Sequence, residues 1–327
     1  MEEVKEGQPH SVELNRLKFY PIMMFAIVMG VSGLTIAYQK AVEFLGFPHI
    51  VGTVLMYIAL GLFAIISLVY IIKLIKYPKA VANEWKHPVR INFFSAISIS
   101  MLMLAIITTK PFPTLHVAFW YAGTIMHFYM TLYTITFWIN HNQEINHSNP
   151  AWFIPIVGNV LVPVAGTDLA STSVLMYFFS VGVFFWIILL AIILNRIIFH
   201  HQLAQKFMPT LFILIAPPAV AFIAYFKMTH HIDFFAQFLY ALAVFFTFMV
   251  AFMANKFLGL KYFISWWAFI FPLAAMSIAA MIVYHKQHDT FSYYFSYIMI
   301  GVTSLMTLIV LYQTIVHMIK KEICIQE

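Results

Sequence analysis

The chain has 327 residues, of which 63% are hydrophobic and only 9% are charged, and its formal net charge is +6. A soluble domain carries about a quarter charged residues, so this composition excludes an ordinary soluble protein and predicts a polytopic membrane protein. The basic residues lie in short loops between apolar segments and the single cysteine is Cys324, which argues against a nucleic-acid partner, a disulfide framework and a multi-cysteine metal site.

The chain begins with a polar, acid-rich segment, residues 1–17, which lacks the basic and apolar regions of a cleaved signal peptide. A span needs about 20 apolar residues, and on that rule we predict ten transmembrane helices in an all-α domain over residues 18–318, followed by a C-terminal tail, 319–327. The largest loop, about 73–90, is short and basic. The predicted spans are 18–37, 50–74, 91–109, 113–139, 151–167, 172–198, 208–227, 232–255, 262–284 and 290–318.

The Lys and Arg residues are distributed unequally between the two sides of the predicted membrane. Of the 18, all but four lie on the side of the N-terminus. The four on the opposite side are Lys40, Lys110, Lys227 and Lys286. By the positive-inside rule, both chain ends are expected to be cytoplasmic and the number of spans to be even.

Very short turns join spans 3 and 4, 5 and 6, 7 and 8, and 9 and 10, which indicates five tandem helical hairpins, and internal repeats are common in transport proteins. No even-numbered span has an interior proline, whereas the odd-numbered spans contain seven. They are Pro21, Pro155, Pro163, Pro209, Pro217, Pro218 and Pro272. The even spans are continuous and rich in Phe, Leu and Ile. We therefore predict five kinked helices inside, around a central pore, and five straight helices outside.

The fifth span, 151–167, contains two prolines, Gly158, Gly166 and Asn159. Proline removes a backbone donor, and backbone groups freed within a bilayer must find partners or face a water-filled cavity. The broken span therefore predicts a path through the protein, with Asn159 as a polar candidate in its lining.

Acidic residues such as Asp168, Asp233 and Asp289 lie at the ends of spans or in turns. Ion-coupled carriers usually keep carboxylates inside the membrane, so this distribution favours a passive path. Selectivity would then come from pore width, hydroxyl and amide donors, helix-end dipoles and a positive rim. Anions are favoured by elimination.

The histidines are the main competing signal, but only His127 lies deep in a span. A haem needs paired histidines from facing helices, and a membrane metalloenzyme needs several on one side, whereas the predicted topology divides them between both sides. We expect no catalytic residue, metal site or cofactor, and a membrane histidine metalloenzyme stays a remote alternative. His127 is interpreted as a hydrogen-bonded packing residue, with a pore or gating role as the alternative.

Two motifs carry a family resemblance. The ninth span contains Trp266-Trp267-x-x-x-Phe271-Pro272, and the fifth begins with Pro150-Ala151-Trp152-x-x-Pro155-x-x-Gly158. These patterns resemble the ninth and fifth helices of the TehA-like and plant slow-type anion channels, a family that includes bacterial tellurite-resistance proteins and fungal malate transporters. The resemblance extends over essentially the whole chain. The third span departs from the kinked pattern, because it has serines but no proline or glycine.

The resemblance implies a homotrimer in the bacterial inner membrane, in which each protomer has its own pore and conducts small inorganic or carboxylate anions passively. It also implies that a phenylalanine of the ninth helix closes the pore. By motif this is Phe271, with Phe269 as second choice. Further candidates for the lining and the kinks, chosen by face and polarity, are Gly33, Ser98, Asn159, Pro163, Ala216, Pro217 and Pro272. The alternative is a carrier or exporter of dicarboxylates or oxyanions such as tellurite, sulfite or malate.

Overall fold

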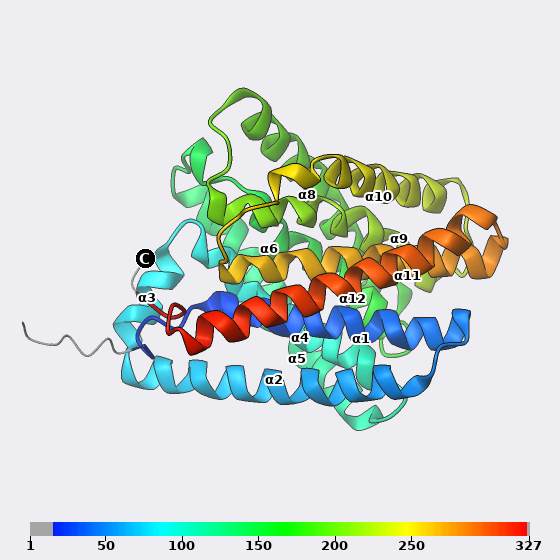
Figure 1. Cartoon of the computed structure of the whole chain (residues 1–327), viewed down its shortest axis with the longest axis horizontal. Coiled ribbons are helices and arrows are strands. Elements are labelled where there is room, and N and C mark those ends of the chain that lie inside the picture. The colour runs from blue at the N-terminus through cyan, green and yellow to red at the C-terminus, as the bar shows by residue number, and fades with distance from the viewer. Residues whose placement is uncertain (1–15, 326–327) are drawn as a thin grey trace, which may run out of the picture.

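The computed structural model describes residues 16–325, which form a bundle of long helices (Figure 1). Helical segments occupy all ten predicted positions. The segments of the even positions are α2 (His49–Lys76), α5 (Pro113–Asn140), α8 (Thr172–Phe199), α10 (Phe234–Phe252) and α12 (Thr290–Ile319). The segments of the odd positions are α1 (Phe25–Leu45), α4 (Ser95–Thr108), α6 (Ile154–Val157) with α7 (Leu161–Gly166), α9 (Ala216–Thr229) and α11 (Ile270–Gln287).

Counted together with the helical turns that directly precede the inner ones, eight of these segments are long and apolar enough to cross a membrane, within residues 16–325. The broken segment Pro150–Gly166 is shorter, and α5 is not among the eight although it has 28 residues. The helical membrane fold is therefore confirmed, while the count of ten spans stays a prediction.

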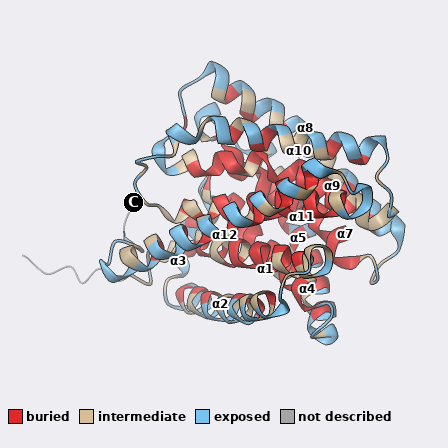
Figure 2. Cartoon of the chain, turned by 45° about the vertical axis from the view of Figure 1, so that its right-hand side comes forward, coloured by how far each residue is buried: buried red, intermediate tan, exposed pale blue. Residues whose placement is uncertain are grey.

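The inner helices close a ring. Each packs against the next in chain order, α1 on α4, α4 on α7, α7 on α9 and α9 on α11, and α11 packs against α1. Each also packs against the outer helix that follows it. In the candidate spans, 72% to 83% of an inner apolar window is buried, against 22% to 39% of an outer one. Figure 2 shows the buried residues gathered in the middle of the bundle and exposed residues along the outer helices. The predicted arrangement of five hairpins, odd helices inside, is confirmed.

All five inner helices begin with a 3-10 segment. These segments are Ile22–Met24, Arg90–Phe94, Pro150–Phe153, Gln205–Leu214 and Ile264–Phe269. In three of the five, prolines occupy the first turn of the α-helix that follows; these prolines are Pro155, Pro163, Pro217, Pro218 and Pro272. A proline there lacks the N–H that would bond four residues back, so the preceding segment cannot continue as a regular α-helix. The third span begins in the same way without a proline, so proline is not the sole cause.

The two ends of the described chain lie at the same end of the bundle, where Arg16 Nη2 donates to the carbonyl oxygen of Lys321 over 3.2 Å (Figure 1). We call this the proximal end and the opposite one the distal end. At the distal end, α1 ends at Gly46, whose φ of 72° lies in the left-handed region that favours glycine. The predicted N-terminal segment lies largely outside the described residues, as do residues 326–327 of the predicted tail.

The predicted proximal loop 73–90 is not a simple loop, because it folds into a further helix, α3 (Pro78–Lys86). A buried ion pair holds α3 in place: Lys73 Nζ of α2 lies 2.7 Å from Glu84 Oε2. Tyr70 donates its hydroxyl proton to the same oxygen over 2.9 Å, and Lys73 also donates to the carbonyl oxygen of Tyr20 over 2.7 Å. Because the loop was predicted from its basic character, the role of the acidic residue Glu84, which folds it back onto α2, was not expected.

Candidate functional site

The ring of inner helices encloses a cavity of about 870 Å³ that reaches from the middle of the bundle to its distal end. Every inner helix contributes to its wall. Examples are Ile36 of α1, Ile107 of α4, Val164 of α7, Ile223 of α9 and Ile278 of α11. A second cavity, of about 60 Å³, lies toward the proximal end and is lined in part by the 3-10 segments, as by Phe93 and Phe153. The two cavities follow the axis on which the sequence predicts a pore.

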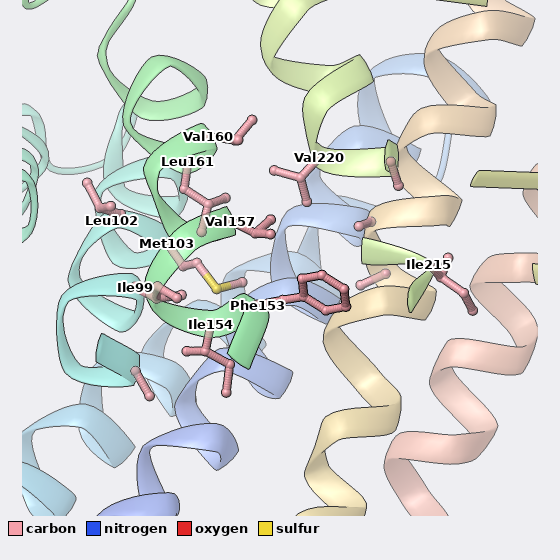
Figure 3. Close-up of a cluster of buried hydrophobic side chains, with 14 of the residues drawn as sticks. Ile99, Leu102, Met103, Phe153, Ile154, Val157, Val160, Leu161, Ile215 and Val220 are labelled. Atoms are coloured by element: carbon pink, nitrogen blue, oxygen red, sulfur yellow. The ribbon is translucent and has the colours of Figure 1, made fainter. Parts of the chain in front are cut away.

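Three residues line both cavities: Leu161 of α7, Val220 of α9 and Phe271 of α11. They therefore lie where one cavity gives way to the other. Figure 3 shows Leu161 and Val220 projecting toward the space between their helices. All three side chains are apolar, and a narrow apolar ring in a pore blocks water and ions without any charged group.

Phe271 stands in the first turn of α11, directly before Pro272, and is half-buried. Gly33 of α1 faces it: a Cβ atom at Gly33 would lie 3.4 Å from both the Cα and the Cδ2 atoms of Phe271. Gly33 and Phe271 therefore face each other directly across the α1–α11 interface. The close approach of α1 and α11 depends on small residues at this level.

Phe269, the second candidate for the gate, lies elsewhere. Its side chain is 3% exposed, and its ring centroid lies 4.6 Å from that of Phe212 and 5.8 Å from that of Trp266. It lines neither cavity. Two positions along a helix correspond to more than half a turn, which is why the two phenylalanines point to different surroundings.

The predicted lining residues divide into two groups. Gly33 lines the distal cavity, whereas Ala216 and Pro272 line the proximal one. The other four line neither cavity: Ser98, Asn159, Pro163 and Pro217.

The polar members of the second group face α5 rather than the axis. Asn159 Nδ2 donates to Thr131 Oγ1 and to the carbonyl oxygen of Ile156, each over 2.9 Å. Ser98 Oγ donates to the carbonyl oxygen of Ser95 over 2.9 Å and lies 2.8 Å from His127 Nδ1. These side chains were expected to line the pore, but in the structure they line neither cavity. Buried polar groups in an apolar bundle take the nearest protein partners.

His127 is fully buried where α4, α5 and the broken fifth helix meet. Its imidazole lies against Gly158, where a Cβ atom would approach the Cε1 atom to 2.2 Å. This position agrees with its interpretation as a hydrogen-bonded packing residue. Within residues 16–325, no group of three or more His, Cys, Asp or Glu side chains is placed to hold a metal ion.

Charged side chains surround the distal mouth of the larger cavity. Lys40, Lys110 and Lys227 line it, together with Glu43 and Asp168. Lys40 Nζ lies 2.6 Å from Glu43 Oε2. Three ammonium groups against two carboxylates leave one net positive charge at the mouth. Sequence reasoning predicted a positive rim without naming its members, although these are three of the four lysines assigned to that side.

The constriction residues Leu161 and Val220 were missed altogether. An aliphatic residue in a chain that is 63% hydrophobic carries no signal of its own, so only the packing of the five helices reveals them.

Comparisons with known proteins agree with this geometry. The profile of a family described as "Voltage-dependent anion channel" matches residues 20–315. An S-type anion channel of Arabidopsis thaliana is 29% identical over 91% of this chain and 48% of its own length. An uncharacterised transporter of Methanocaldococcus jannaschii is 30% identical over 82% of this chain and 86% of its own. A tellurite resistance protein TehA homolog of Haemophilus influenzae is 27% identical, over 93% and 94%. The chain thus spans about half the length of the plant relatives that it matches.

Proposed function

The chain belongs to the voltage-dependent anion channel family, and from this premise we propose that it is a passive channel for small inorganic or carboxylate anions that Phe271 closes. The observation that carries the proposal is that Phe271, with Leu161 and Val220, lines both cavities on the axis of the bundle. Gly33 and Pro272 support it, since Gly33 of α1 lies against Phe271 and Pro272 stands beside Phe271 in the first turn of α11.

In this mechanism an anion enters the distal cavity, where the net positive mouth raises its local concentration. At the constriction it meets three apolar side chains that offer no replacement for its water. The ring of Phe271 closes the path because a hydrated anion cannot pass and a dehydrated one is not stabilised. Movement of this ring, or its removal, joins the two cavities.

We propose a location in the bacterial inner membrane with both chain ends cytoplasmic, so that the distal cavity opens outward. The distribution of Lys and Arg supports this orientation. We also propose a homotrimer with one pore in each protomer. The contacts of the inner helices support one pore per chain, since their ring encloses an axis within a single chain, and the number of three chains follows from the family resemblance.

A carrier is the second candidate, because one relative is a malic acid transport protein of Schizosaccharomyces pombe, 23% identical over 81% of this chain. The two functions are separated by flux into liposomes that hold the Phe271→Ala variant. A channel gives chloride uptake that rises linearly with the gradient and needs no anion on the other side. Saturable uptake that requires an exchangeable anion inside would contradict the channel and support the carrier.

A further inference from the structure

We propose that the distal cavity is a binding site for monocarboxylates that carry an apolar tail, with the carboxylate at the lysine rim and the tail along the aliphatic wall above Phe271. The proposal names a ligand class for the proposed channel. It rests on the proposed function in one respect, namely that the bound ligand occupies the conduction path.

The rim supplies charge that the protein does not fully neutralise. Lys40 is paired with Glu43, whereas Lys110 and Lys227 form no ion pair with any residue in the described range. These lysines come from three different elements, namely α1, the turn after α4, and α9. Ammonium groups that converge on one cavity from separate elements suit a single carboxylate, which accepts several charge-assisted hydrogen bonds.

Below the rim, each of the five inner helices contributes aliphatic side chains to the wall. These side chains include Ile36, Ile107, Val164, Val220, Ile223 and Ile278. Hydroxyl groups on the same helices turn away into their own backbone. Thr35 Oγ1 donates to the carbonyl oxygen of Val31 over 2.8 Å, and Thr108 Oγ1 to that of Leu104 over 2.7 Å. Ser277 Oγ does the same toward Leu273 over 2.9 Å.

Polar lining residues nearer the mouth are engaged in the same way. Gln39 Nε2 donates to the carbonyl oxygen of Ile107 over 3.0 Å, and Thr109 Oγ1 donates to that of Ile106 over 2.9 Å. A hydrated inorganic anion therefore finds charge at the rim but few free donors deeper in the cavity. A hydrocarbon tail has no hydrogen bonds to water that it would lose there, and burial of its apolar surface is favourable.

The size of the cavity fits this class of ligand. Small-molecule sites typically measure about 300–1,000 Å³ and combine mostly apolar walls with a few well-placed polar groups, and the distal cavity of about 870 Å³ has both features. A dicarboxylate of the same length would force its second charge against the aliphatic wall, where burial without a partner is unfavourable. A monocarboxylate is therefore expected to bind more tightly than a dicarboxylate of equal chain length.

The test is calorimetric titration of the full chain in lipid nanodiscs with acetate, butanoate, hexanoate and succinate, each corrected with protein-free nanodiscs. We expect the affinity to rise by up to about fourfold for each added methylene and butanoate to bind more tightly than succinate. The variant Lys110→Gln/Lys227→Gln should weaken hexanoate binding by at least about tenfold, as loss of a charge-assisted contact predicts. Lys286→Gln removes one positive charge at the same end but outside the cavity lining, so it should leave the affinity unchanged.

Equal affinity for acetate and hexanoate would overturn the proposal, and so would hexanoate binding that the double lysine variant leaves unchanged. Both lysines are at least partly exposed, and gel filtration of each variant verifies that it is folded. Calorimetry measures binding without any current. The carboxylate site and the anion channel can therefore be contradicted independently of each other. Chain-length-dependent binding without any chloride current would contradict the channel alone, and chloride current without binding would contradict the carboxylate site alone.

Discussion

His127 and Gly158 show how single residues fix the position of the broken fifth helix. The imidazole fills the space that a side chain at position 158 would need, and its Nδ1 atom is anchored by Ser98. The sequence marks both residues, one as a deep histidine and the other as a helix breaker. It does not reveal that they touch, because they lie on different hairpins and contact between hairpins has no local pattern.

Replacement of Gly158 by alanine should destabilise the protein by about 2 kcal/mol, because the new Cβ atom would overlap the His127 ring. The midpoint of thermal unfolding in detergent measures the effect. Gly61→Ala is the matched control, since nothing lies within 4 Å of a Cβ atom there. The double variant His127→Ala/Gly158→Ala should cost less than the sum of the two single variants. Strict additivity would show that the two residues do not share this space.

Cys324 provides a pH-dependent test near the proximal end. Burial raises the pKa of its thiol to about 11, although Arg16 and Lys73 oppose the shift. Only the thiolate reacts with maleimide, so the labelling rate should rise about tenfold per pH unit from pH 7 to 9.5 without levelling off. Free glutathione, an ordinary thiol with a pKa of about 8.5, should level off within this range. A plateau for Cys324 near pH 9 would contradict its burial.

Among the elements, the inner helices were largely predictable, whereas the 3-10 start of the third span and helix α3 were not. Prolines at 155, 163, 217, 218 and 272 mark the places where 3-10 backbone gives way to α-helix, because a missing N–H acts on the local backbone whatever the tertiary context. The 3-10 start of the third span has no such marker. Helix α3 was missed because Glu84, its buried anchor, pairs with a residue on the preceding helix, and charge counting along a loop does not detect such a pair.

The ion pair between Lys73 and Glu84 should contribute strongly to the docking of α3. Lys73→Met leaves Glu84 buried with the Tyr70 hydroxyl but without its cation, and we expect a loss of about 3–5 kcal/mol in the free energy of unfolding. Lys73→Met/Glu84→Leu removes both charges and should recover part of that loss. The exposed pair of Lys40 and Glu43 is the control, and Lys40→Met should change stability by less than about 1 kcal/mol. Equal effects at the two pairs would contradict the buried role.

For the whole molecule, the ring of five inner helices followed from proline segregation and hairpin connectivity, both of which are readable in sequence. Phe271 was found through a motif, whereas its partners Leu161 and Val220 have no distinguishing chemistry. The polar residues of the pore lining were predicted less well than Phe271. Ser98 and Asn159 looked like pore donors by polarity, yet their hydrogen bonds to α5 and to local backbone are what a polar group in an apolar bundle needs first.

The proposed homotrimer predicts three independent pores. Single complexes of Phe271→Ala in planar bilayers should show three equal current levels, and native mass spectrometry of the same sample should give three chains per particle. The physical reason is that each chain closes its own ring of inner helices. A single current level from a three-chain particle would place the pore between protomers instead.

Graded shortening of the Phe271 side chain tests whether its ring closes the path. Chloride current is recorded in planar bilayers from wild type, Phe271→Leu and Phe271→Ala at equal protein amounts, with Phe269→Ala as the matched control that lines neither cavity. If the ring of Phe271 closes the path, the current should rise from wild type through leucine to alanine, by at least about tenfold overall, with no increase for Phe269→Ala. A folded Phe271→Ala protein as silent as wild type, or current opened by Phe269→Ala instead, would contradict it.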